Sequence, residues 1–137
     1  MLTNAGKAVY LDSSALVKLI MSERGSEELG SFLGGRSVWV SCSLARVEVI
    51  RAVMIREPNA LPRAQELLNR LHLVNLDDQV LDRAAHLDPP LLRTLDAIHL
   101  AAAHTMRSRL DEFVTYDGRQ ASGAHLLGFT VIAPGTA

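Results

Sequence analysis

The stretch VYLDSSALVKLI, residues 9–20, decides the fold of this chain. Its first four residues are an apolar run that predicts a short buried strand ending at an acidic residue, Asp12. Ser13 or Ser14 can cap a following helix, in which the apolar residues recur at helical spacing. A buried strand that leads directly into a helix is typical of proteins with a parallel sheet.

The same alternation of strand and helix continues along the rest of the chain. Ser43 and Thr94 are expected to cap two helices, and Pro58 is expected to end the first of these. The pattern therefore predicts one α/β domain over residues 1–137, with a mostly parallel sheet of about five strands covered on both faces. The further strands are expected at residues 37–42, 73–76, 113–116 and 129–133, and the helices at 15–23, 26–35, 43–57, 61–70, 78–87, 95–106 and 118–127.

Composition restricts the classes of function. A length of 137 residues is enough for one buried core, and a net charge of −1 provides no overall attraction for nucleic acid. Aromatic residues make up only 4% of the chain, which argues against a base-stacking platform. The single cysteine, Cys42, excludes a disulfide within the chain and a thiolate zinc cluster. We see no signal peptide and no membrane span, so a cytoplasmic protein is expected.

Two acidic residues follow apolar strands. Asp12 ends the run VYLD, and Asp117 ends the run FVTYD. Because right-handed crossovers place the carboxyl ends of parallel strands along one edge of the sheet, both acids are expected at that edge. Open α/β sheets bind their ligands there.

Two more acidic residues interrupt alanine-rich helical segments. Glu48 lies in SLARVEVIRAVM and Asp96 in TLDAIHLAAAH, each flanked by small or apolar side chains. Carboxylates gathered in one cleft repel each other unless a cation compensates, and Mg²⁺ or Mn²⁺ prefers such oxygen ligands. The four acids together therefore predict a Mg²⁺ or Mn²⁺ site that cuts a phosphodiester bond.

Each acid taken alone also has an ordinary structural explanation. Asp12 could cap the helix that follows it, and Asp117 could stabilise the turn at Gly118. Asp96 could interact with the positive end of a helix, and Glu48 could pair with an arginine. His99, one turn after Asp96, is expected to be a hydrogen-bonded packing residue.

Several segments together resemble the PIN-domain ribonucleases, specifically the VapC-type toxins of type II toxin–antitoxin systems. The resemblance spans residues 9–134, and it depends on the segments VYLDSSALVKL, RVEVIRA, LRTLDAIHLAAA, FVTYDGRQ and GFTVIAP. It implies an α/β/α sandwich and a metal-dependent endoribonuclease that hydrolyses RNA at an acidic site.

Carried over to this sequence, the resemblance makes Asp12 and Asp96 the principal metal ligands. Glu48 would complete the cluster, directly or through a water, and Asp117 would be the fourth acid. Ser13 and Thr115 would then lie in a second shell of hydrogen-bond donors.

The resemblance also implies a cognate VapB-like antitoxin and a homodimer as partners. Two other functions stay open from the residues alone. One is phosphotransfer with Asp12 as the nucleophile, and the other is a catalytically silent module that binds a protein partner.

Overall fold

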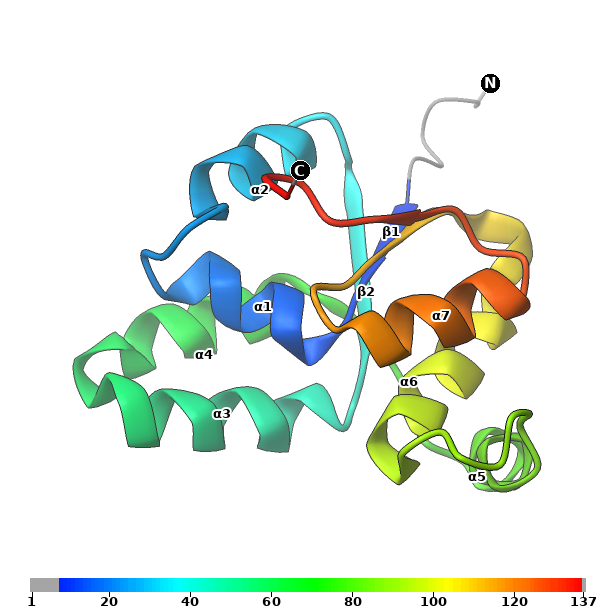
Figure 1. The fold of residues 1–137 in the computed structure, drawn as a ribbon. Coiled ribbons are helices and arrows are strands. Elements are labelled where there is room, and N and C mark those ends of the chain that lie inside the picture. The colour runs from blue at the N-terminus through cyan, green and yellow to red at the C-terminus, as the bar shows by residue number, and fades with distance from the viewer. Residues whose placement is uncertain (1–7, 137) are drawn as a thin grey trace.

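The computed structural model describes residues 8–136, and its centre is a five-stranded sheet (Figure 1). Neighbouring strands are parallel and lie in the order β3-β2-β1-β4-β5, which confirms the expected parallel α/β fold. Residues 1–7 and residue 137 lie outside the described range. The expectation that the chain has no signal peptide concerns this first segment. The strands are β1 (Ala8–Leu11), β2 (Val38–Cys42), β3 (His72–Val74), β4 (Leu110–Val114) and β5 (Val131–Ile132).

Helices cover both faces of the sheet and complete an α/β/α sandwich (Figure 1). Helices α1 to α4 share one hydrophobic core with the sheet, and α5 to α7 share the other. No helix within residues 8–136 is both long enough and apolar enough to cross a membrane. The helices are α1 (Ser13–Ile20), α2 (Ser26–Leu33), α3 (Ala45–Arg56), α4 (Leu61–Arg70), α5 (Asp78–Ala85), α6 (Thr94–Thr105) and α7 (Gly118–Leu126).

The position of the central strand β1 between two hydrophobic cores explains why its sequence is apolar throughout. Val9 and Leu11 lie in the core beneath α1 to α4, whereas Ala8 and Tyr10 lie in the core beneath α5 to α7. Successive side chains of a strand point to opposite faces, so a strand covered on both faces needs apolar residues at every position.

The carboxyl ends of β1 and β4 lie next to each other at one edge of the sheet. Leu11 is paired with Val114, and the backbone N–H of Asp12 donates to the carbonyl oxygen of Val114 at 3.3 Å. The register therefore brings Asp12 beside Thr115, although the two residues are far apart in the sequence. This is the edge where the sequence predicted that the strand-end acids meet.

The main differences from the sequence-based expectations are at helix starts. Asp12, rather than Ser13 or Ser14, caps α1, because its side chain accepts from the backbone N–H of Ala15. Ser43 does not cap α3, since its hydroxyl donates to the carbonyl oxygen of Val74. Helix α6 begins at Thr94 itself, without a side-chain cap. Tertiary contacts therefore determine which hydrogen bonds these polar side chains make.

Candidate active site

Asp12 is almost fully buried at the carboxyl end of β1, with 3% of its surface exposed. One carboxylate oxygen, Oδ1, accepts from the Ser14 hydroxyl at 2.6 Å and from the Ala15 backbone N–H at 3.1 Å. The other, Oδ2, accepts from the Thr115 hydroxyl at 2.5 Å. Burial raises the pKa of Asp12, although the hydrogen bonds from Ser14 and Thr115 oppose this effect. Asp12 is thus both a helix cap and a rigidly held acid.

Asp96 lies in the first turn of α6. Burial, followed by the negative charges of Asp117 and Asp12, raises the pKa of the Asp96 carboxyl. Its Oδ2 atom is buried and has no hydrogen-bond partner. The negative charges of the two other aspartates therefore act on Asp96, and one of its own oxygens is left unsatisfied.

Asp117 caps α7, where the sequence had suggested a role in the turn at Gly118. Its Oδ1 atom accepts from the backbone N–H groups of Arg119 at 2.8 Å and Gln120 at 3.3 Å. Its own backbone N–H donates to the hydroxyl of Thr115, which in turn donates to Asp12. Thr115 therefore connects two of the acids through one hydroxyl group.

Glu48 projects from α3 and is held by two side chains from other helices. The Ser13 hydroxyl donates to Glu48 Oε1, and His99 Nε2 lies 2.7 Å from the same oxygen. Burial acts to raise the pKa of Glu48. The hydrogen bond and the charge of His99, together with the hydrogen bond from Ser13, outweigh this effect and lower that pKa. Glu48 therefore pairs with a histidine, where the sequence had left open a salt bridge to an arginine.

His99 is buried and hydrogen-bonded, as expected from its position in an alanine-rich helix. Its Nδ1 atom lies 2.8 Å from the Tyr10 hydroxyl and 3.7 Å from the Cys42 sulfur. Burial disfavours the charged ring, but the contacts with Cys42 and Glu48 raise the pKa of His99 to about 10. His99 therefore binds Glu48 through one ring nitrogen and Tyr10 through the other.

The acids suit a hard divalent cation in their chemistry. Mg²⁺ and Mn²⁺ favour carboxylate oxygens, and the unsatisfied buried oxygen of Asp96 is an atom that a cation or a water would satisfy. Within residues 8–136, no three His, Cys, Asp or Glu side chains are already arranged to hold a metal ion. Glu48 is held by His99, and the assignment of all four acids as ligands stays a prediction.

A cavity of about 350 Å³ opens directly beside Glu48. Hydroxyl and acidic groups line it together with Lys18 and Arg56, and both of these cations pair with Glu23, which also lines the cavity. Tyr116 also lines it, and Lys18 Nζ lies 4.5 Å from the centre of that ring. Glu23 therefore offsets the positive charge of Lys18 and Arg56 in this cavity.

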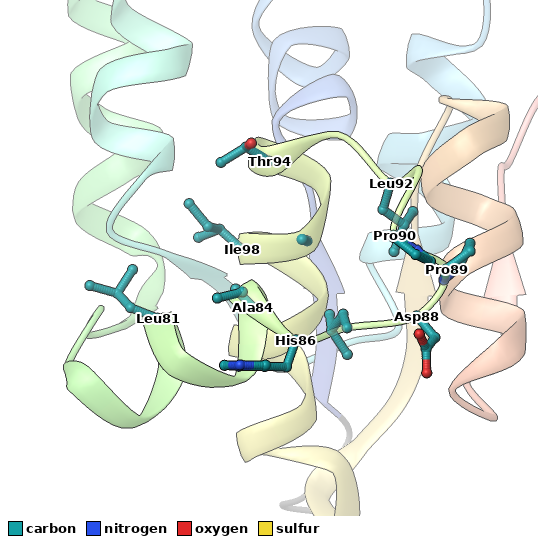
Figure 2. A pocket seen from close by; sticks show the side chains of 12 residues that line it. Leu81, Ala84, His86, Asp88, Pro89, Pro90, Leu92, Thr94 and Ile98 are labelled. Carbon is teal, nitrogen blue, oxygen red and sulfur yellow. The ribbon is translucent and has the colours of Figure 1, made fainter.

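A larger cavity of about 520 Å³ lies away from the acids, between α5, the following turn and α6 (Figure 2). Leu81 and Ala84 of α5 face Ile98 of α6 there, and Pro90 and Leu92 lie across from them. The four acids are not among its lining residues. This cavity is largely apolar, so it is unsuited to hold a phosphodiester or a metal ion.

Sequence reasoning missed two contacts at the site. Ser14, considered only as a helix cap, donates to Asp12, and His99 reaches Glu48 from a helix on the other side of the sheet. The three-residue spacing of Asp96 and His99, which places both on one face of α6, was the available signal for the second contact. The predicted contacts of Ser13 and Thr115 with the acids are present.

Comparison with known proteins identifies relatives of the whole chain. The sequence profile of the PIN domain matches residues 9–126. Ribonuclease VapC46 of Mycobacterium tuberculosis is 46% identical over 127 residues, which cover 93% of this chain and 98% of that protein. Ribonuclease VapC35 of the same species is 41% identical over 133 residues, covering 94% of this chain and 98% of the relative.

A solved structure has the same fold at much lower sequence identity. The crystal structure of Mycobacterium tuberculosis VapC20, described as a sarcin–ricin loop cleaving toxin, superimposes with a TM-score of 0.72. The match covers 92% of this chain and 99% of VapC20 at 15% identity. The arrangement of strands and helices is therefore shared well beyond the range of obvious sequence similarity.

Proposed function

Because the chain belongs to the PIN domain family, among its VapC ribonucleases, we propose that it cleaves RNA at the acid site with the help of Mg²⁺ or Mn²⁺. As a VapC ribonuclease it is an RNA-cleaving hydrolase, the toxin of a toxin–antitoxin pair. The observation that carries the metal assignment is the buried Oδ2 atom of Asp96, which has no hydrogen-bond partner and lies among acids that repel it.

Asp12, Asp96 and Asp117 would hold the cation, and Glu48 would face it directly or through a water. A bound Mg²⁺ or Mn²⁺ supplies a Lewis acid for the phosphoryl oxygen and lowers the pKa of water. Thr115 keeps Asp12 in one orientation, because its hydroxyl donates to Oδ2. Ser13 and His99 both bind Oε1 of Glu48, so Oε2 is the oxygen that can orient the attacking water.

Phosphotransfer through Asp12 is disfavoured by the surroundings of its carboxylate. Both oxygens already accept hydrogen bonds, and only 3% of the residue is exposed. A covalent nucleophile needs an oxygen that can reach the phosphorus atom, whereas these oxygens are surrounded by donors of the protein itself. A catalytically silent module is the remaining alternative, and the experiment below distinguishes it.

The partners follow from the same family membership. We infer a cognate VapB-like antitoxin, a homodimer and a cytoplasmic location, with residues 1–137 acting as one domain. Exposed apolar residues on α3, namely Val47, Met54 and Ile55, offer a surface for a protein partner. Light scattering of the purified chain, with Ile55→Asp as the variant, tests whether this surface forms the dimer, and an unchanged dimer for that variant argues against it.

Removing the metal tests the proposal directly. Purified protein treated with EDTA should lose RNA cleavage, and added Mg²⁺ or Mn²⁺ should restore it. Binding to the folded state should also raise the free energy of unfolding, by about 2.7 kcal/mol at a Mn²⁺ concentration one hundred times the Kd. Thermal unfolding with and without Mn²⁺ measures this, and Ca²⁺, a larger hard cation, serves as the comparison. Cleavage that persists in EDTA would contradict the metal assignment, and neither binding nor cleavage would favour the silent module.

A further inference from the structure

A chain of hydrogen bonds connects the buried core to the acid site through His99. It begins at Tyr10, which is fully buried in β1, and passes through the His99 ring to Glu48. Only 2% of His99 is exposed, and the rings of Tyr10 and His99 meet edge to face with centroids 5.8 Å apart. His99 is therefore fixed by packing on one side and bonded to Glu48 on the other.

The direction of these hydrogen bonds follows from the groups involved. An ionised Glu48 can only accept, so Nε2 of His99 must carry the hydrogen that lies between them. At the other end of the ring, the Tyr10 hydroxyl lies 2.8 Å from Nδ1, where it can accept from the charged ring or donate to the neutral one. Each polar atom in the chain thus has a suitable partner, and the orientation of the ring is determined from both ends.

The position of Glu48 depends on this ring because the two helices belong to different layers. Helix α3, which carries Glu48, packs on the first face of the sheet, and α6, which carries His99, packs on the second. The contact at 2.7 Å joins residues 51 positions apart across the sheet edge. Both His99 and Ser13 bind Oε1, which leaves Oε2 as the oxygen directed to other ligands.

We propose that His99 is a positioning residue, which holds Glu48 through Nε2 so that Oε2 is presented to the cation and its water. This inference rests on the proposed function and goes beyond the four acids. Helix α6 then contributes two residues from one face. Asp96 would bind the metal, and His99, three residues later, would orient the carboxylate of Glu48 on α3. Partners of metal-ligating groups characteristically act in this way.

The competing explanation is that His99 only fills space in the core. The two explanations differ in what His99→Gln and His99→Phe should do. The glutamine amide keeps a donor for Glu48 and an acceptor besides, whereas phenylalanine fills the space without either. If His99 acts through its hydrogen bond, only the phenylalanine variant should lose the function.

The experiment measures Mn²⁺ affinity by electron paramagnetic resonance, together with single-turnover RNA cleavage at increasing Mn²⁺. We expect His99→Phe to weaken Mn²⁺ binding by about 10- to 100-fold, with cleavage recovering at high Mn²⁺, and His99→Gln to retain most of the affinity. In a Glu48→Gln background, His99→Phe should cause no further loss, because the group it positions is already changed. His104→Gln, a histidine near the other end of α6, is the matched control and should bind Mn²⁺ as the wild type does.

Equal Mn²⁺ affinity for His99→Phe and the wild type would overturn the proposal, as would a folded His99→Gln that is as weak as His99→Phe. If His99→Phe does not fold, Tyr10→Phe replaces it, since it removes only the hydroxyl that anchors Nδ1. We then expect weaker Mn²⁺ binding for Tyr10→Phe, and unchanged affinity would refute the inference. A wild-type protein that binds no Mn²⁺ would overturn the proposed function itself, and this inference with it.

Discussion

The carboxylates of Glu23 and Asp96 lie in two regions of this molecule that differ in the charges around them. Glu23 lies between two cations, with Arg56 Nη2 at 2.8 Å and Lys18 Nζ at 3.3 Å, and the hydrogen bond from Arg56 is the main cause that lowers its pKa. Asp96 instead has burial and two other aspartates acting on it, and its pKa is raised. Cationic side chains therefore accompany Glu23, which supports the fold, whereas Asp96 lies in a site where negative charge is in excess.

Replacing Asp96 by asparagine should have the largest effect. Asp96→Asn removes a predicted metal ligand, and because metal-assisted catalysis is worth several kcal/mol, we expect RNA cleavage to fall at least about a thousandfold. The metal-free fold should lose no stability, since the substitution also removes a charge that its neighbours repel. Cleavage rates and thermal unfolding in EDTA measure the two effects, with the exposed Asp82→Asn on α5 as control. Full activity in Asp96→Asn would end the assignment.

Asp12→Asn should also abolish cleavage, but it differs from Asp96→Asn in its effect on folding. The amide nitrogen cannot accept, so either the Ala15 backbone N–H or the Thr115 hydroxyl loses its acceptor. We expect the free energy of unfolding to fall by about 1–3 kcal/mol, the usual cost of a lost cap or an unmade buried hydrogen bond. Urea unfolding in EDTA measures this. Equal stability of the Asp12→Asn and Asp96→Asn proteins would remove the distinction between the two acids.

Glu23→Gln should have the smallest effect and a characteristic pH dependence. Because the pKa of Glu23 is lowered in the folded state, its ion pairs stabilise the protein above the unfolded-state pKa, and this stability is lost as pH falls through the folded-state pKa. The pairs are partly exposed, so we expect a loss below about 1 kcal/mol near neutral pH, disappearing in acid. Urea unfolding from pH 7 to pH 3 tests this. A difference from wild type that grows in acid would show that the cations do not act through the charge of Glu23.

The sheet was predictable because its signal is local. Apolar runs such as residues 9–12 can be buried on both faces only in a covered parallel sheet, and the observed split of β1 between two cores matches this requirement. Helix caps were less predictable, since a serine or threonine hydroxyl has several possible acceptors. Ser43 illustrates this, because its hydroxyl binds Val74 of a strand that lies 31 residues away.

The site was predictable to the extent that the sheet defines it. The positions of Asp12 and Asp117 follow from the end of a parallel strand, and Thr115 follows from the register between β1 and β4. The pairing of Glu48 with His99 could not be deduced, because it depends on how two helices on opposite faces are rotated about their own axes. Local sequence patterns identify the face of a helix but do not identify the residue from another layer that meets it.

The hydrogen bond between Thr115 and Asp12 spans 103 positions of the sequence. During synthesis, β1 leaves the ribosome long before β4 exists, so Asp12 cannot bind Thr115 until most of the polypeptide has been made. Incomplete translation products that stop before β4 therefore lack Thr115 and Asp117, one of the four acids. The predicted acid site is therefore complete only after the last part of the message has been read.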